Sequence, residues 1–233
     1  MDAFEELQHR IVACERCPEL RAYCARIASE KKRAHRHDDY WGRPVPAFGD
    51  PAARALLVGL APGAHGSNRT GRMFTGDASG VWLYRALHRA GYASQAEQRD
   101  RADGMRLRGA LISAALRCAP PGNAPTPSQL RNCFPYLQRE IELLPELRVV
   151  VGLGAIGTRA AENALVAAGF AFARRHAFGH GAESVAHGAR GPVVLVSSYH
   201  PSRQNTNTGV LTEPMLDAVF ARTRELSRGP SDP

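Results

Sequence analysis

The chain has 233 residues, 44% of them hydrophobic and 22% charged, which is the composition of a globular protein with one large domain or two small ones. No stretch approaches the roughly 18 consecutive apolar residues that a membrane span needs, and the acidic start does not resemble a signal peptide, so we expect a cytoplasmic protein with no membrane partner. Lysine and arginine number 30 against 22 aspartates and glutamates, and this net charge of +8 favours a polyanionic partner.

Helical patterns and short apolar runs alternate along the chain. Apolar residues at helical spacing predict a helix over residues 3–30, and the polar, basic segment 31–46 predicts a surface loop. Apolar runs predict strands at 55–60, 110–116, 148–153 and 192–198. Further patterns predict helices at 81–90, 128–143, 154–168 and 212–226, with Ser128 as a candidate N-cap.

This alternation predicts an α/β fold in which a mostly parallel sheet has helices on both faces. We expect one domain over residues 1–227 and a frayed tail at 228–233. Ligands of such folds bind beyond the carboxyl ends of the strands. The site is therefore expected in the loops that follow Leu60, Leu116, Leu153 and Ser198.

Two of these loops carry residues suited to chemistry. The segment 59–77 is rich in glycine and proline, so its backbone N–H groups can approach an anionic ligand, and its only carboxylate is Asp77. Long irregular segments in compact domains are usually functional. The other loop begins with His200 and is polar as far as Gly209, which places His200 where the site of such a fold lies.

Five cysteines in a reducing compartment indicate metal ligation or burial rather than disulfides. Cys14 and Cys17 form a C-x-x-C pair, which Cys118 and Cys133 can join only through the fold. Four thiolates suit either a [4Fe–4S] cluster or structural zinc, and their spacing does not decide between the two. Cys24 lies outside the pairs and best fits a buried free thiol.

A third motif, Gly152-x-Gly154-x-x-Gly157, follows a predicted strand and opens a predicted helix, as a dinucleotide-binding fingerprint does. No acidic residue ends a strand about 20 residues later, where that fingerprint has one. Arginines 174 and 175 lie there instead, which leaves NADP open. Close packing of a helix on a strand also explains the glycines, and we favour that interpretation.

Taken together, three segments resemble the type B (family 5) uracil-DNA glycosylases. They are GLAPGAHGSNRTGRMFTGDASG at 59–80, RCAPPGNAPTP at 117–127 and HPSRQNTNTG at 200–209. The Cys14/Cys17 and Tyr40-Trp41-Gly42 segments agree as well, so the resemblance runs from Cys14 to about residue 220.

The resemblance implies a three-layer α/β/α sandwich around a four-stranded parallel sheet. It also implies a [4Fe–4S] cluster, partly held by the N-terminal helix, on Cys14, Cys17, Cys118 and Cys133. The implied activity is that of a monomeric enzyme that flips uracil, and often other deaminated bases, out of double-stranded DNA. It hydrolyses the glycosidic bond and leaves an abasic site.

Roles for individual residues follow from the same resemblance. Asp77 is expected to align water and stabilise the sugar, and His200 to stabilise the departing base. Phe74 is expected to stack on the base and Asn123 to read its edge. Related families have an acidic or amide residue directly after the first glycine of this motif. Here Leu60 and Ala61 follow Gly59, so water activation must fall elsewhere.

The remaining expected contacts are to the base and to the DNA backbone. Expected base contacts are Gly59, Ala61, Pro62 and Gly63, and expected DNA contacts are Arg69, Arg72, Ser202, Arg203 and Asn205. Two other classes of protein stay open. One is a nucleic-acid-binding module whose cysteines hold a metal without catalysis, and the other is an NADP-dependent oxidoreductase.

Overall fold

The computed structural model describes residues 2–228, so the expected tail lies, from residue 229 on, outside the described residues. The strands are β1 (Phe48–Gly49), β2 (Ala55–Gly59), β3 (Ala110–Ala114), β4 (Val149–Leu153), β5 (Ala171–Phe172), β6 (Glu183–Gly188) and β7 (Gly191–Ser198). The α-helices are α1 (Ala3–Val12), α2 (Pro18–Glu30), α3 (Ser67–Thr70), α4 (Ala78–Arg89), α5 (Pro127–Glu142), α6 (Gly154–Ala167), α7 (Arg203–Asn207) and α8 (Glu213–Ser227). Two 3₁₀ turns, η1 (Arg33–His35) and η2 (Pro121–Asn123), complete the described elements.

The sheet is mostly parallel, as predicted, but within the described residues it has seven strands rather than four, in the order β1-β3-β2-β4-β7-β6-β5. The predicted strands are its parallel centre, β3-β2-β4-β7. Antiparallel pairing adds β1 to one edge, and β6 and β5 to the other. These additions escaped prediction because β1 and β5 are two residues long and β6 buries only Ala186 of its six residues.

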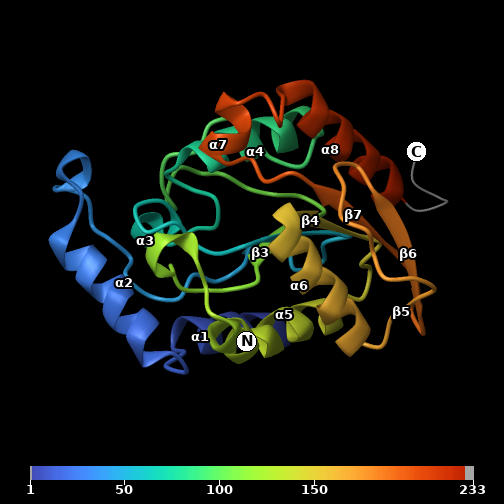
Figure 1. Ribbon diagram of the computed structural model, residues 1–233, viewed down its shortest axis with the longest axis horizontal. Coiled ribbons are helices and arrows are strands. Elements are labelled where there is room, and N and C mark those ends of the chain that lie inside the picture. Colours follow the sequence, from blue (N-terminus) through green and yellow to red (C-terminus); the bar gives the residue numbers. More distant parts are fainter. Residues whose placement is uncertain (1, 229–233) are drawn as a thin grey trace.

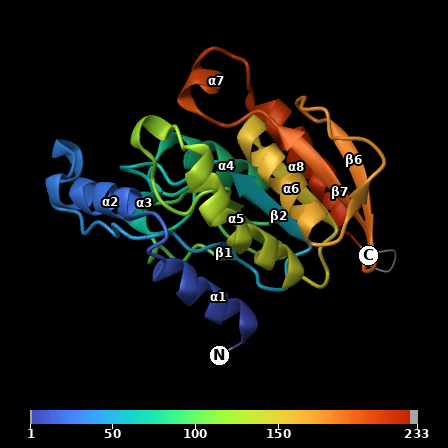
Figure 2. The ribbon, with the colours of Figure 1, turned by 60° about the horizontal axis from the view of Figure 1, so that its bottom comes forward.

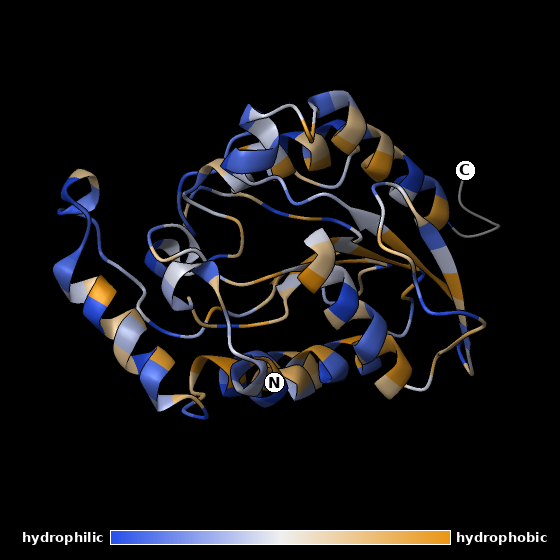
Figure 3. Cartoon of the chain, in the orientation of Figure 1, coloured by the Kyte–Doolittle hydropathy of each residue, from blue (hydrophilic) through white to orange (hydrophobic). Residues whose placement is uncertain are grey.

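Helices cover both faces of the sheet, which makes three layers (Figure 1). Leu56 and Val58 of β2 pack toward α5 and α6, whereas Ala55 and Leu57 pack toward α4 and α8. This alternation follows from the two-residue period of a strand. Hydrophobic and hydrophilic residues alternate along the helices, whereas the central strands are mostly hydrophobic (Figure 3). No helix among the described residues is long and apolar enough to cross a membrane.

The predicted N-terminal helix is in fact two helices, α1 and α2. The break falls at Cys14–Cys17, and Pro18 lies at the first turn of α2, where its missing N–H costs nothing. Thr126 rather than Ser128 caps α5, through a capping box with Gln129.

The loop after β7 also differs from the prediction, because it contains the short helix α7, which projects beyond the end of the sheet (Figure 2).

The glycines of the fingerprint-like segment pack α6 against the sheet. A Cβ on Gly152 would lie 2.4 Å from the Cα of Thr158, and one on Gly157 would lie 2.4 Å from the carbonyl oxygen of Val58. The packing interpretation is therefore confirmed for these two positions.

Candidate active site

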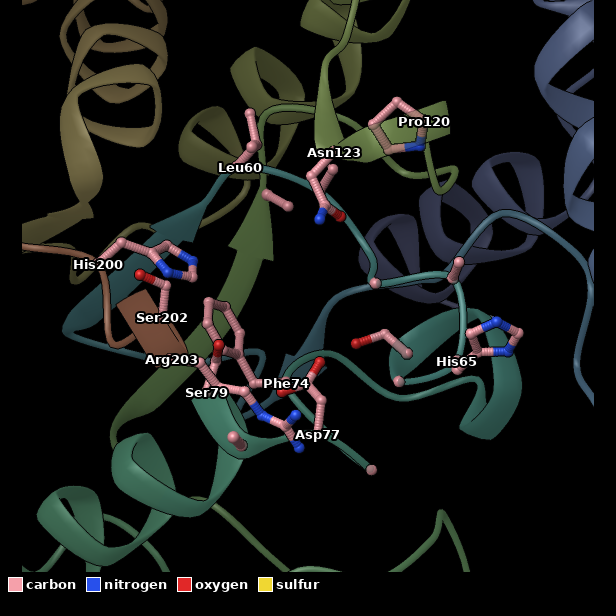
Figure 4. A pocket seen from close by; sticks show the side chains of 18 of the residues that line it. Leu60, His65, Phe74, Asp77, Ser79, Pro120, Asn123, His200, Ser202 and Arg203 are labelled. Atoms are coloured by element: carbon pink, nitrogen blue, oxygen red, sulfur yellow. The ribbon is translucent and has the colours of Figure 1, made fainter. Parts of the chain in front are cut away.

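A pocket of about 880 Å³ opens beyond the carboxyl ends of the parallel strands, the edge where the fold predicts a site. Its walls come from the loop after β2, the segment around η2 and the segment that joins β7 to α7 (Figure 4). Of the residues expected from the sequence, it is lined by Ala61, Gly63, Phe74, Asp77, Asn123, His200, Ser202 and Arg203.

Asp77 lines the pocket and is also the N-cap of α4. Its Oδ1 accepts a hydrogen bond of 3.0 Å from the backbone N–H of Gly80. Its Oδ2 lies against the glycine-rich loop, where a Cβ on Gly66 would approach it to 2.3 Å. The carboxylate is thus fixed by a helix N-terminus, whose partial positive charge favours an anion.

Phe74 and His200 form a tilted ring pair, with centroids 5.8 Å apart and planes at 30°. Phe74 adopts a left-handed backbone with φ of +52°, a costly conformation for an aromatic residue and one that marks functional sites. Burial lowers the pKa of His200, and the negative charge of Asp77 opposes that shift. The imidazole is therefore mainly uncharged at neutral pH and can both donate and accept a hydrogen bond.

Asn123 lies in η2 with φ of +57°, a conformation that asparagine tolerates better than other side chains. Its amide points into the pocket from the side opposite Phe74 and Asp77 (Figure 4). An amide so placed can present both a donor and an acceptor to the edge of a ring that enters between them.

Gly59 and Pro62 are not among the residues that line the pocket, which corrects the expectation that they contact the base. Pro62 is buried within its loop. Gly59 lies behind Phe74, where a Cβ would come within 2.8 Å of the ring. Asn205 is also outside the lining, because its Nδ2 donates to the carbonyl oxygen of His200 at 2.9 Å.

Arg69 and Arg72, two of the arginines expected to contact DNA, make hydrogen bonds within the protein instead, so that expectation is corrected. The Arg69 side chain is 12% exposed and donates to Asp38 at 2.7 Å, to the carbonyl oxygen of His65 at 2.8 Å and to that of Gly76 at 3.1 Å.

Arg72 is buried even more deeply, with a side chain only 3% exposed. It makes two hydrogen bonds of 2.7 Å to the carboxylate of Asp103. Burial alone would raise the pKa of Asp103, but its hydrogen bonds with Arg72 and nearby backbone N–H groups bring it well below the usual range. Neither Arg69 nor Arg72 can reach a phosphate without breaking these bonds.

Arg203 and Ser202, by contrast, remain at the pocket. Arg203 is exposed and lines the opening. Ser202 caps α7, and its Oγ accepts from the backbone N–H of Asn205 at 3.3 Å.

Sequence reasoning missed several lining residues, namely Tyr23, Lys32, His35, His65, Ser79 and Gln204. The Nδ1 of His65 lies 3.0 Å from the hydroxyl of Tyr40. Burial lowers the pKa of His65, and the positive charge of Lys32 lowers it further. The basic run KKRAHRH signalled a charged surface, but only the fold brings that run to the pocket.

The cysteines gather in one hydrophobic cluster with the buried side chains of α1 and α2. Cys17, Cys24, Cys118 and Cys133 are buried there, and Cys14 packs against them. Asn132 donates to the Sγ of Cys17 at 3.4 Å, and burial, with Cys14 and Cys17 nearby, raises the pKa of Cys133 to about 11. Among the described residues, no group of three or more His, Cys, Asp or Glu side chains is disposed to hold a metal ion.

Comparison with known proteins gives consistent matches. Residues 46–224 match the model of the uracil DNA glycosylase superfamily. A type-5 uracil-DNA glycosylase of Thermus thermophilus is 49% identical over 96% of this chain and 98% of its own length. Proteins of the same name are 45% identical in Mycobacterium bovis, over 95% of this chain and 81% of the relative, and 42% identical in Pyrobaculum aerophilum, over 94% and 91%.

Proposed function

The chain belongs to the uracil-DNA glycosylase superfamily, and from this premise we propose that it removes uracil from DNA by hydrolysing the N-glycosidic bond, leaving an abasic site for base-excision repair. The observation that carries the proposal is the convergence of Phe74, Asp77, Asn123 and His200 in one pocket. An oxidoreductase is not supported, since Gly152 and Gly157 pack α6 on the sheet. A module without catalysis does not explain that convergence.

Recognition begins when the nucleotide leaves the duplex, because the glycosidic bond of a stacked base is out of reach. The ring of Phe74 offers a stacking face, and the amide of Asn123 offers a donor and an acceptor to the base edge. Arg203, exposed at the opening, is the side chain we assign to a phosphate.

Cleavage then separates charge, with positive charge on the sugar and negative charge on the departing base. The carboxylate of Asp77 stabilises the oxocarbenium-like sugar and aligns a water molecule toward its anomeric carbon, as carboxylates do in glycoside cleavage. The N–H of a neutral His200 ring stabilises the leaving base. Water supplies a hydroxyl group to the sugar, and its proton neutralises the base.

We also propose activity on other deaminated bases in double-stranded DNA. The pocket of about 880 Å³ exceeds the volume of a single pyrimidine, and a side-chain amide can pair with rings of different donor and acceptor pattern. The test uses matched duplexes that each carry one altered base, with alkali to reveal abasic sites. We expect strand cleavage with uracil and with at least one of hypoxanthine and xanthine, but none with the unaltered duplex. Cleavage of uracil alone would remove this extension.

For the cysteines we propose a [4Fe–4S] cluster on Cys14, Cys17, Cys118 and Cys133. Support comes from the donor chemistry, since thiols from distant segments gather in one buried place. Each thiolate of such a cluster binds a different iron, so its ligands need not converge on one point as they do around a single ion.

Such a cluster would supply a cross-link rather than chemistry at the base. Ala61 and Ala64, which line the pocket, pack against the cysteine-containing hydrophobic cluster. Iron and sulfide content, together with visible absorbance of anaerobically prepared protein, tests the cluster. Zinc in place of iron would overturn it.

Finally, we propose that the enzyme acts as a monomer in the cytoplasm. The side chains to which we assign the chemistry, Asp77 and His200, lie in the same chain, so the proposed reaction needs no second copy. The relatives compared above come from bacteria and archaea, whose DNA lies in the cytoplasm. Sedimentation of the protein with and without a uracil-bearing duplex tests the stoichiometry, and a stable dimer would contradict it.

A further inference from the structure

Three side chains of the pocket each rest on a glycine. A Cβ on Gly59 would lie 2.8 Å from the ring of Phe74, and one on Gly66 would lie 2.3 Å from the carboxylate of Asp77. A Cβ on Gly154 would lie 3.2 Å from the Cβ of His200. The missing side chains therefore leave room for these three residues.

The sheet explains why Gly154 lies beside His200. Strand β4 runs between β2 and β7, with Val58 opposite Gly152 and Leu153 opposite Ser198. Gly154 directly follows β4, so it lies at the edge of the sheet between Gly59, which ends β2, and the segment that carries His200. The paired rings of Phe74 and His200 are thus seated on the ends of neighbouring strands.

We propose that Gly154, the middle glycine of the fingerprint-like segment, is a positioning residue of the excision reaction and that Gly59 plays the same part for Phe74. The proposal rests on the function proposed above. Gly154 differs from Gly152 and Gly157, whose added Cβ atoms would meet α6 or β2 rather than a residue of the pocket. Its role is to let the His200 imidazole stand close to the sheet edge, opposite Phe74.

A methyl group at Gly154 would move His200, because the atom that it meets is the Cβ next to the His200 backbone rather than the end of a flexible chain. The contact of 3.2 Å requires His200 to shift by a few tenths of an ångström. Since a misplacement of about 1 Å in a catalytic group can cost about 10²-fold in rate, this smaller shift is expected to cost about tenfold. DNA affinity, which depends mainly on phosphate contacts, is expected to hold.

Backbone strain has to be separated from this contact, since Gly154 has φ of +79° and any other residue there is strained. The other end of α6 offers a matched control. Gly169 has φ of +88°, but a Cβ on it would meet nothing within 4 Å. Gly154→Ala and Gly169→Ala therefore carry similar strain, and only the first carries the contact.

The test measures single-turnover excision of uracil, duplex affinity and thermal midpoint for both variants, and repeats Gly154→Ala in a His200→Ala background. We expect Gly154→Ala to lose about tenfold in rate with unchanged affinity, and Gly169→Ala to stay within about threefold. In the His200→Ala background the contacted Cβ remains but the imidazole that the methyl would displace is gone, so the added methyl should cost less than about threefold. Equal rates for the two single variants, or full additivity in the double variant, would overturn the proposal.

Should Gly154→Ala fail to fold, Gly59 provides a second test, since its backbone lies outside the left-handed region and its Cβ meets only the Phe74 ring closely. Gly59→Ala should slow excision, whereas Gly59→Ala/Phe74→Leu should match Phe74→Leu alone. A further loss in the double variant would contradict the role. Absence of uracil excision by the wild-type protein would instead defeat the proposed function, so the two failures are distinguishable.

Discussion

Asp77 shows how one side chain serves both the fold and the chemistry. It caps α4 through the N–H of Gly80, and it lines the pocket beside the glycine-rich loop. Asparagine caps helices about as well as aspartate, so the charge of Asp77 can be removed while its structural role is kept.

The arginines show that side chains of equal charge can have different roles. Arg69 and Arg72 hold the loop between β2 and α4 together from inside, whereas Arg203 is exposed at the pocket. The sequence predicts a basic surface but not which guanidinium meets a carboxylate, since Asp38 and Asp103 are both 31 residues from their partners.

Replacing Arg203 by alanine should weaken DNA binding in every sequence context and flatten the slope of log affinity against log salt by about one. The measurement is equilibrium binding to a duplex over a series of salt concentrations. Arg139→Ala is the control, because it removes an equal charge from an exposed ion pair on α5, outside the pocket lining. An Arg203→Ala slope equal to that of the control would take Arg203 off the DNA-binding surface.

At the scale of helices and strands, the elements with a strong hydrophobic pattern were the ones that the sequence predicted. The four parallel strands are largely buried and appear in the sequence as apolar runs, so their positions along the chain could be predicted. The edge strands carry too few buried residues to show a period. The break between α1 and α2 and the short helix α7 depend on Pro18 and on the Ser202 cap, which are weak signals in polar segments.

His176 links the hairpin of β6 and β7 to α6, where its backbone N–H donates to Oε1 of Glu162 at 2.8 Å. Its Nδ1 lies 2.8 Å from the Oγ of Ser184 and its Nε2 lies 2.9 Å from the Oγ of Ser197. Burial lowers the pKa of His176, although the carboxylate of Glu162 opposes the shift. A lowered pKa means that the unfolded chain takes up the proton first, so this stabilisation is present above the ordinary pKa of about 6.5 and is lost as the pH falls through it.

His176→Gln should therefore lower the thermal midpoint at pH 7 and make its fall between pH 7 and about pH 5 shallower than in the wild type. Thermal unfolding at a series of pH values measures both effects. His187→Gln, an exposed substitution on the same hairpin, is the matched control and should leave the wild-type slope. A slope for His176→Gln as steep as that control would show that His176 is not the titrating group.

At the scale of the whole molecule, the fold brings together three segments, none of which carries all the residues of the pocket. The pocket combines the loop after β2, η2 and the start of the β7–α7 connection, all placed by the carboxyl edge of the sheet. The motifs predicted these segments because they follow strands. They could not predict that Gly59 packs behind Phe74 and that Asn205 donates to the backbone of His200, since both contacts depend on how the loops pack on one another.

The proposed cluster would fasten the start of α2 to α5 and to the segment after β3, and metal binding of that kind is folding free energy. Cys17→Ala should give colourless protein of low solubility and lowered thermal midpoint. Cys24→Ala, which removes a buried thiol that donates to the carbonyl oxygen of Ala119 at 3.7 Å, should keep its colour. Visible absorbance and unfolding curves of both variants are the measurement. Soluble, colourless and fully active Cys17→Ala would contradict a structural cluster.

The most direct test of the account is single-turnover excision of uracil by Asp77→Asn at saturating enzyme. Asparagine keeps the α4 cap and the shape beside Gly66 but removes the charge, so the thermal midpoint and DNA affinity should hold. The rate should fall by about 10²–10⁴-fold, the usual worth of a positioned acid–base group. A rate within about threefold of the wild type would show that the Asp77 carboxylate is not the catalyst.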